Sequence, residues 1–210
     1  MKKNLVLGVL FILPIVAYLF FASGIHNFAK LPILTTSVKE LDFAPEVELK
    51  DHITVLGFLG DEIPAEGGTL FNLNQKIYTY FSQFDDFQFV YLVPEGTDKE
   101  KLQDVIDELS QISDMTHWKF VFTTTDNIKS VFNSLKSPYK LENDHGSPYI
   151  FIIDKEGNLR GRDDDEDVGD LYGYNSTDVA ELANKMKDDV KIVLAEYRLA
   201  LKKYNAERKK

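Results

Sequence analysis

The 210-residue chain contains no cysteine, and this absence excludes several classes of function. Disulfide exchange, thiol-based peroxide reduction and thiolate metal binding all require the sulfur anion of cysteine. A lipoprotein is excluded as well, because the acylated residue would have to be cysteine. Since a chain without cysteine folds equally well in oxidising and reducing compartments, its cysteine content does not indicate a location.

Basic residues are outnumbered by acidic ones, 24 to 34, and the formal net charge is -10. A number of the basic residues lie at the two ends of the chain: Lys2, Lys3, Lys202, Lys203, Arg208, Lys209 and Lys210. No basic stripe with interleaved aromatic residues occurs between residues 40 and 190, so nucleic-acid binding is not expected. Hydrophobic residues make up 44% of the chain, which is enough to build the core of one domain.

Residues 1–24 are predicted to form a short cytoplasmic stub and a transmembrane anchor. The almost uncharged run at residues 5–22 follows two lysines, and about 20 apolar residues span a bilayer as a helix. The positive-inside rule keeps the N-terminus in the cytoplasm and exports the remainder. We therefore expect a single-pass protein of the cytoplasmic membrane whose C-terminal domain faces the extracytoplasmic, periplasmic side. A cleaved signal peptide is the alternative, although the apolar run is long for one and the cleavage site is poor.

Residues 25–45 are interpreted as a tether that leads into a domain at residues 46–210, with an edge strand near residues 46–49. Hydrophobic periodicity then predicts strands and helices in alternation. The strands lie at residues 53–59, 87–93 and 118–123, the helices between them at residues 69–84 and 98–110, and a further helix capped by Asp126 follows. Such alternation requires crossover connections and therefore parallel strands.

The last third of the chain departs from this alternation. The strands predicted at residues 149–154 and 159–162 are joined by only four residues, so they should form an antiparallel hairpin. A long helix follows, which begins near Ser176 or Thr177. The whole order predicts an α/β fold, a thioredoxin-like three-layer α/β/α sandwich with a mixed sheet, preceded by one N-terminal transmembrane helix.

Three sequence segments carry a resemblance to a known family. They are ITVLGFLG from Ile53, DEIPAEGG from Asp61 and DHGSPYIFIIDKEGNLRG from Asp144. Together with the N-terminal apolar run, they resemble the Sco/SenC-type proteins, thioredoxin-fold copper chaperones of respiratory oxidase assembly. The resemblance covers roughly residues 46–195 and implies the same fold.

The copper site that this resemblance implies is broken here. In the family, two cysteines separated by three residues follow the first strand, and Asp61 and Ala65 stand at the matching positions. The family's histidine is matched by His145, next to Asp144, with one extra residue before Asp154. Because copper(I) prefers thiolate and thioether ligands, no metal-binding residue is predicted. No cofactor-binding or catalytic residue is predicted either. The alternative is a copper-binding chaperone that uses His145 with non-cysteine ligands such as Asp61 or Glu62.

Three further features have competing interpretations. The resemblance implies a cis peptide bond before Pro148, beside the loop after the first strand. The acidic run at residues 163–167 lacks the ligand spacing of a calcium loop, so a solvated surface is expected. Tyr172 and Tyr174 are expected either to anchor a partner or to cover the hairpin.

No pair of residues has the spacing of a nucleophile and its base, so the chain is not predicted to be an enzyme. We expect a membrane-anchored, redox-inactive protein that binds another membrane or exported protein. The resemblance implies respiratory oxidase assembly as the setting.

Overall fold

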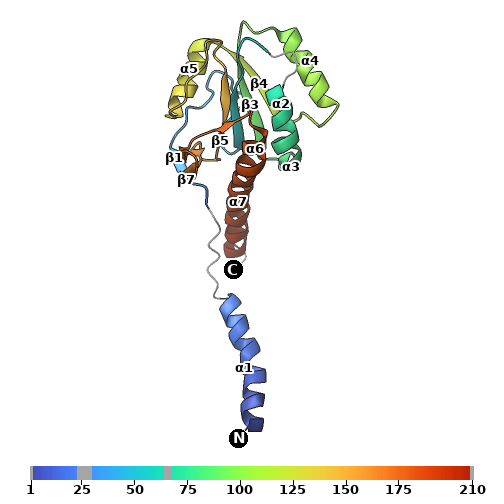
Figure 1. Cartoon of the computed structure of the whole chain (residues 1–210), viewed down its shortest axis with the longest axis vertical. Coiled ribbons are helices and arrows are strands. Elements are labelled where there is room, and N and C mark those ends of the chain that lie inside the picture. The colour runs from blue at the N-terminus through green and yellow to red at the C-terminus, as the bar shows by residue number, and fades with distance from the viewer. Residues whose placement is uncertain (1, 23–29, 64–67, 209–210) are drawn as a thin grey trace.

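The computed structural model describes residues 2–22, 30–63 and 68–208 (Figure 1). Helix α1 (Lys2–Ala22) contains the apolar run and has Pro14 in its interior. Among the helices described, none combines the length and the apolarity that a membrane span needs.

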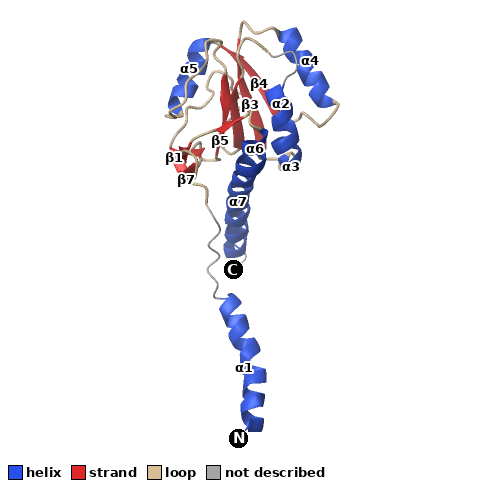
Figure 2. Ribbon diagram, viewed as in Figure 1, coloured by secondary structure: helices blue, strands red, loops and turns tan. Residues whose placement is uncertain are grey.

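A mixed sheet forms the centre of the domain (Figure 2). Strands β2 (Ile53–Phe58), β3 (Phe87–Pro94) and β4 (Trp118–Thr123) are parallel neighbours. Strand β5 (Ser147–Ile153) lies antiparallel on the other side of β2, and β6 (Leu159–Arg160) completes the predicted hairpin with it. Every residue of β2 and β3 is buried, as expected for strands that are covered on both faces.

Two layers of helix cover this sheet. One face packs against the helical segment formed by α2 (Gly68–Leu73), η1 (Asn74–Tyr78) and α3 (Thr79–Phe81), against α4 (Lys99–Ser110), and against the C-terminal helical segment. That last segment consists of α6 (Val179–Glu181), η2 (Leu182–Met186) and α7 (Lys187–Arg208). The other face packs against α5 (Thr125–Ser134) and the chain between Val38 and Leu49. Alternate residues of one strand, such as Val55 and Leu56, therefore enter opposite halves of the core.

The arrangement is thioredoxin-like: a parallel βαβ unit and an antiparallel hairpin share one sheet, with helices on both faces. This confirms the predicted α/β fold with a mixed sheet. Two helix starts differ from the prediction by a few residues. Thr124, rather than Asp126, caps α5, and Asp178 caps the C-terminal segment, because their side chains accept hydrogen bonds from the first free backbone N–H groups.

The predicted edge strand at residues 46–49 is wrong. The backbone N–H groups of Leu49 and Lys50 instead donate to the carboxylate of Glu40, which holds this segment in turns. The edge strand is β1 (Ile33–Thr35), which pairs antiparallel with β6. The division between tether and domain stays a prediction, but the described part of residues 25–45 places Leu31 and Leu41 in buried positions.

A small second sheet replaces the predicted acidic loop. This sheet consists of β7 (Arg162–Asp165) and β8 (Gly169–Leu171), which pair antiparallel. Strand β9 (Tyr174–Asn175) instead pairs with the start of β5 and belongs to the main sheet. Asp165 is buried, so the run at residues 163–167 is not a uniformly solvated surface.

Candidate functional site

Two loops meet where β2 ends and β5 begins. Phe58, the last residue of β2, lies opposite Ser147, the first residue of β5. The chain before Ser147 folds back over the chain after Phe58, and the backbone N–H of Asp61 donates to the carbonyl of Asp144 at 3.1 Å. We call residues 60–63 and 142–147 the loop pair. The described part of the loop after the first strand thus lies beside the segment that contains Pro148, as the resemblance implied.

Two glycines allow this close contact. A Cβ atom on Gly60 would overlap the carboxylate of Asp144, and one on Gly146 would lie 2.8 Å from the backbone nitrogen of Gly60. The Asp144 carboxylate in turn accepts a hydrogen bond from the Gly146 N–H at 3.0 Å. Sequence reasoning missed both glycines as parts of the site. Their places, one just after a strand and one just before a strand, were the available signal.

The loop pair lines an open, acidic hollow of about 630 Å³. Its lining residues are Asp61, Glu62, Glu142, Asn143 and Asp144. None of these four carboxylates forms an ion pair with a lysine, arginine or histidine of the described chain. The hollow therefore attracts positively charged groups and repels anions.

Carboxylate and amide oxygens are hard ligands, whereas copper(I) is a soft ion that prefers sulfur. Asp61 lies at the hollow, while Ala65, the second position matched to a family cysteine, falls outside the described residues. In the part of the chain that the structure describes, no three histidine or acidic side chains gather closely enough to hold a metal ion. The donor set of the loop pair does not fit the copper that the family binds.

His145 does not line the acidic hollow. It lines a neighbouring hollow together with Phe132 and Lys129 of α5 and with Tyr139. Its backbone has a positive φ of 67° and its N–H donates to the carbonyl of Glu142, so the residue closes the turn of its own loop. His145 and the pair Asp61 and Glu62 therefore line different hollows.

The predicted cis bond before Pro148 is wrong. The Ser147–Pro148 peptide is trans, the ordinary form of such bonds, and it continues the extended backbone of β5. The carbonyl of Pro148 accepts hydrogen bonds from both the backbone N–H and the hydroxyl of Ser176. This carbonyl ties the start of β5 to the chain just after β9.

The aromatic residues near β5 serve mainly to pack the core. Tyr174 is fully buried and donates its hydroxyl to Asp189 at 2.7 Å, so it covers the sheet rather than a partner. Tyr172 packs against the core from a partly buried position. Tyr139 stacks on Tyr149 with 3.8 Å between ring centroids, and burial raises the pKa of Tyr139 to about 12.

At the opposite end of the sheet lies a second set of charges, which we call the ion-pair cluster. It consists of Asp154, Arg160, Arg162, Asp165, Lys185, Asp189 and Glu196. Arg160 is 5% exposed and donates to Asp154, to Glu196 and to the carbonyl of Leu31. The cluster ties the start of the domain, the β5–β6 hairpin and α7 together.

Within this cluster, Asp165 and Lys185 form an ion pair at 2.8 Å. Burial alone would raise the pKa of Asp165, but hydrogen bonds from Lys185 and from the Asp167 N–H bring it below its ordinary value. The Lys185 ammonium donates to the carboxylates of Asp165 and Asp167, and these hydrogen bonds raise the pKa of Lys185. Arg162 binds both carboxylate oxygens of Asp189, and this contact raises the pKa of Arg162. The carboxylates of the ion-pair cluster are thus paired with cations, unlike the carboxylates of the open hollow.

Comparison with known proteins finds no family model and no curated protein that matches the chain. Similar solved structures exist, among them a SCO1/SenC family lipoprotein from Bacillus anthracis (16% identity, 84% of this chain and 99% of that one, TM-score 0.46). The soluble domain of Sco1 from Bacillus subtilis is another (12% identity, 77% of this chain and 94% of that one, TM-score 0.47). A third is a putative electron transport protein from Aquifex aeolicus (13% identity, 79% of this chain and 96% of that one, TM-score 0.47). Sco-type proteins, which the sequence resembles, are thus among its structural neighbours.

Proposed function

We propose that this protein is a membrane-anchored, redox-inactive thioredoxin-like protein that acts by binding another membrane or exported protein. The observation that carries the proposal is the loop pair. Two loops are held together at one end of the sheet, yet they present four carboxylates in place of any sulfur. A surface of this kind supports contact with a partner rather than chemistry on a thiol.

The missing sulfur is the reason for proposing an inactive domain. Electron transfer through a dithiol needs a thiolate that attacks and a second one that leaves, and the chain supplies neither. The oxygens of the loop pair do not replace the ligands of a cuprous site. Binding is the activity that these residues still support.

The proposed location follows from the N-terminal run. Residues 5–22 are close to the length that crosses a bilayer, and two lysines precede them. The domain then lies on the extracytoplasmic side, where its partner must also be exposed. The resemblance to Sco/SenC-type proteins makes a component of respiratory oxidase assembly the first partner to examine.

Site-specific photocrosslinking tests this proposal. A photoreactive residue is placed at Glu62 or at Asn143 of the full chain, and at the exposed Asp104 on α4 as a matched control. After irradiation of membranes from the organism that makes the protein, Glu62 and Asn143 should give an adduct with the same protein. Asp104 should not. Adducts that are shared by all three positions, or absent at Glu62 and Asn143, contradict binding through the loop pair.

A further inference from the structure

The end of α7 carries the opposite charge to the rest of the protein. Between residues 198 and 210 there are six lysines or arginines and one acidic residue, in a chain with a net charge of -10. Helix α7 continues through this segment as far as Arg208. Its direction therefore determines where this positive charge lies.

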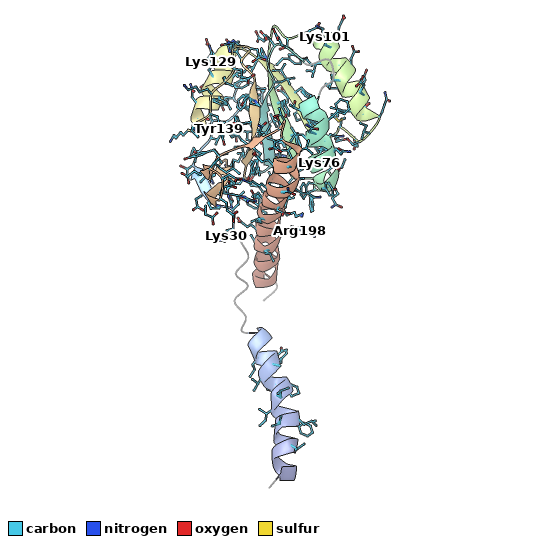
Figure 3. The ribbon with its side chains drawn as sticks, viewed as in Figure 1. Lys30, Lys76, Lys101, Lys129, Tyr139 and Arg198 are labelled. Carbon is cyan, nitrogen blue, oxygen red and sulfur yellow. The ribbon has the colours of Figure 1, made fainter. Side chains whose placement is uncertain are left out.

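The ion-pair cluster determines that direction. Leu31, where the chain enters the domain, donates its N–H to Glu196 of α7 at 3.0 Å. Arg160 binds the carbonyl of Leu31 and both oxygens of Glu196, which holds the N-terminal segment against the helix. Lys30 and Arg198 accordingly lie at the same end of the domain (Figure 3). Beyond Glu196, α7 continues for twelve residues to Arg208, which is about 18 Å of helix.

The same end is the one from which the chain leads back to α1. Leu31 follows Ala22, the last residue of α1, by nine residues, and this length of chain reaches at most about 30 Å. If α1 is the anchor, which is part of the function proposed above, Leu31 cannot lie farther than this from the bilayer. The basic end of α7 is then within reach of the lipid headgroups.

We propose that the basic end of α7 binds the anionic phospholipid headgroups of the membrane that holds the anchor. Charge complementarity supports this occupant, because the remainder of the domain is acidic and is repelled by such a surface. The contact gives the domain a fixed orientation. The ion-pair cluster faces the bilayer, and the loop pair, at the other end of the sheet, faces away from it toward a partner.

The absence of native cysteine makes a direct test possible. Asn205→Cys in the full chain is labelled with an environment-sensitive fluorophore and reconstituted into vesicles of phosphatidylcholine with or without phosphatidylglycerol. Asp104→Cys on α4 is the matched control. Quenching of the Asn205→Cys label by headgroup-quencher lipid should increase with phosphatidylglycerol, and in about 1 M salt, where charges are screened beyond about 3 Å, the increase should disappear. The Asp104→Cys label should not respond.

Charge removal sharpens the test. Each basic residue near an anionic surface changes the bound-to-free ratio roughly fivefold, so changing Lys202, Lys203, Arg208, Lys209 and Lys210 to Gln should abolish the response. If the chain stays incorporated in the vesicles but the label at position 205 does not respond to phosphatidylglycerol, the proposal for α7 is wrong and the proposed anchor is unaffected. The same result combined with protection of Asn205 in native membranes assigns the segment to an acidic protein surface instead. Extraction of the chain by alkaline carbonate overturns the anchor, and this proposal with it.

Discussion

The two ends of the sheet use the same kind of residue in opposite ways. At the ion-pair cluster, Asp154, Asp165 and Asp189 are buried and each accepts a hydrogen bond from a cation. At the loop pair, Asp61 and Glu62 are exposed beside an open hollow. Buried carboxylates with matched cations hold elements in place, whereas open ones remain available for binding. The ion-pair cluster thus holds the fold together, while the carboxylates of the loop pair have no such structural role among the ion pairs of the described chain.

The largest effect is expected from Arg160→Met. This change leaves Asp154 and Glu196 without their shared cation and removes the hydrogen bond that the carbonyl of Leu31 accepts from Arg160. Breaking a buried ion pair costs about 3–5 kcal/mol of unfolding free energy. Urea titration of the free energy of unfolding measures it. Arg198→Met, which removes an exposed arginine of α7, the helix that carries Glu196, should cost less than about 1 kcal/mol. Equal costs for the two variants would show that Arg160 does not organise its end of the sheet.

A smaller loss, with a pH signature, is expected from Lys185→Met. Since Lys185 is partly exposed, we expect the variant to lose about 1–3 kcal/mol of unfolding free energy at pH 7. The folded-state pKa of Asp165 lies below its ordinary value of 3.8, so its contribution is present above that pH and is lost as the pH falls through the folded pKa. The pKa of Lys185 is raised above 10.5, so its contribution is present below pH 10.5 and is lost as the pH rises further.

The difference between wild type and Lys185→Met should therefore shrink in acid below pH 3.8 and in alkali above pH 10.5. Lys191→Met removes an exposed ion pair from α7, which directly follows the η2 segment of Lys185, and should cost about 0.5 kcal/mol or less. A difference that stays constant from acid to alkali would argue against an ion pair at Asp165.

Because the two loops are in contact, Gly60→Ala should lower the free energy of unfolding by about 1–2 kcal/mol, since the new methyl group meets the Asp144 carboxylate. Shortening that side chain in the double variant Gly60→Ala, Asp144→Ala should recover part of the loss relative to the two single changes. Thermal or urea unfolding of all four proteins gives the coupling free energy. Strict additivity would mean that a side chain at position 60 does not meet the Asp144 carboxylate.

Neutralising two of the four carboxylates of the hollow is expected to leave the stability of the fold almost unchanged. Asp61→Asn with Glu62→Gln removes two exposed charges and should alter the free energy of unfolding by less than about 0.5 kcal/mol. Crosslinking from Asn143 to the partner should nevertheless fall, because the charge that attracts the partner is reduced. A clear loss of stability would show that these exposed carboxylates, like those of the ion-pair cluster, hold the fold together.

The smallest effect is expected from His145→Ala in a copper titration. His145 and the Asp61 side of the loop pair line different hollows, and the chain has no thiolate. Wild type and variant should therefore bind copper(I) and copper(II) equally weakly, as measured by competition with a chelator. Tight, stoichiometric binding that depends on His145 would restore the copper chaperone as the function of the loop pair.

Local pattern accounts for much of what the sequence predicted correctly. A buried strand such as β3 consists almost entirely of apolar residues, and a connection of only a few residues between two strands is too short for a parallel crossover. The edge strand was missed because residues 33–35 become a strand only by pairing with β6, more than a hundred residues later. A three-residue segment carries too little periodicity to reveal such a partner.

By itself, the sequence determined that no thiol chemistry is possible and that strands and helices alternate before a closing hairpin. The first follows from composition, and the second from the period at which apolar side chains recur. Only the tertiary structure decided that Gly60 touches Gly146, that His145 and Asp61 line different hollows, and that the buried Asp165 pairs with Lys185. These contacts join residues far apart in the chain, and it is their packing geometry that determines whether a charged side chain meets an opposite charge or water.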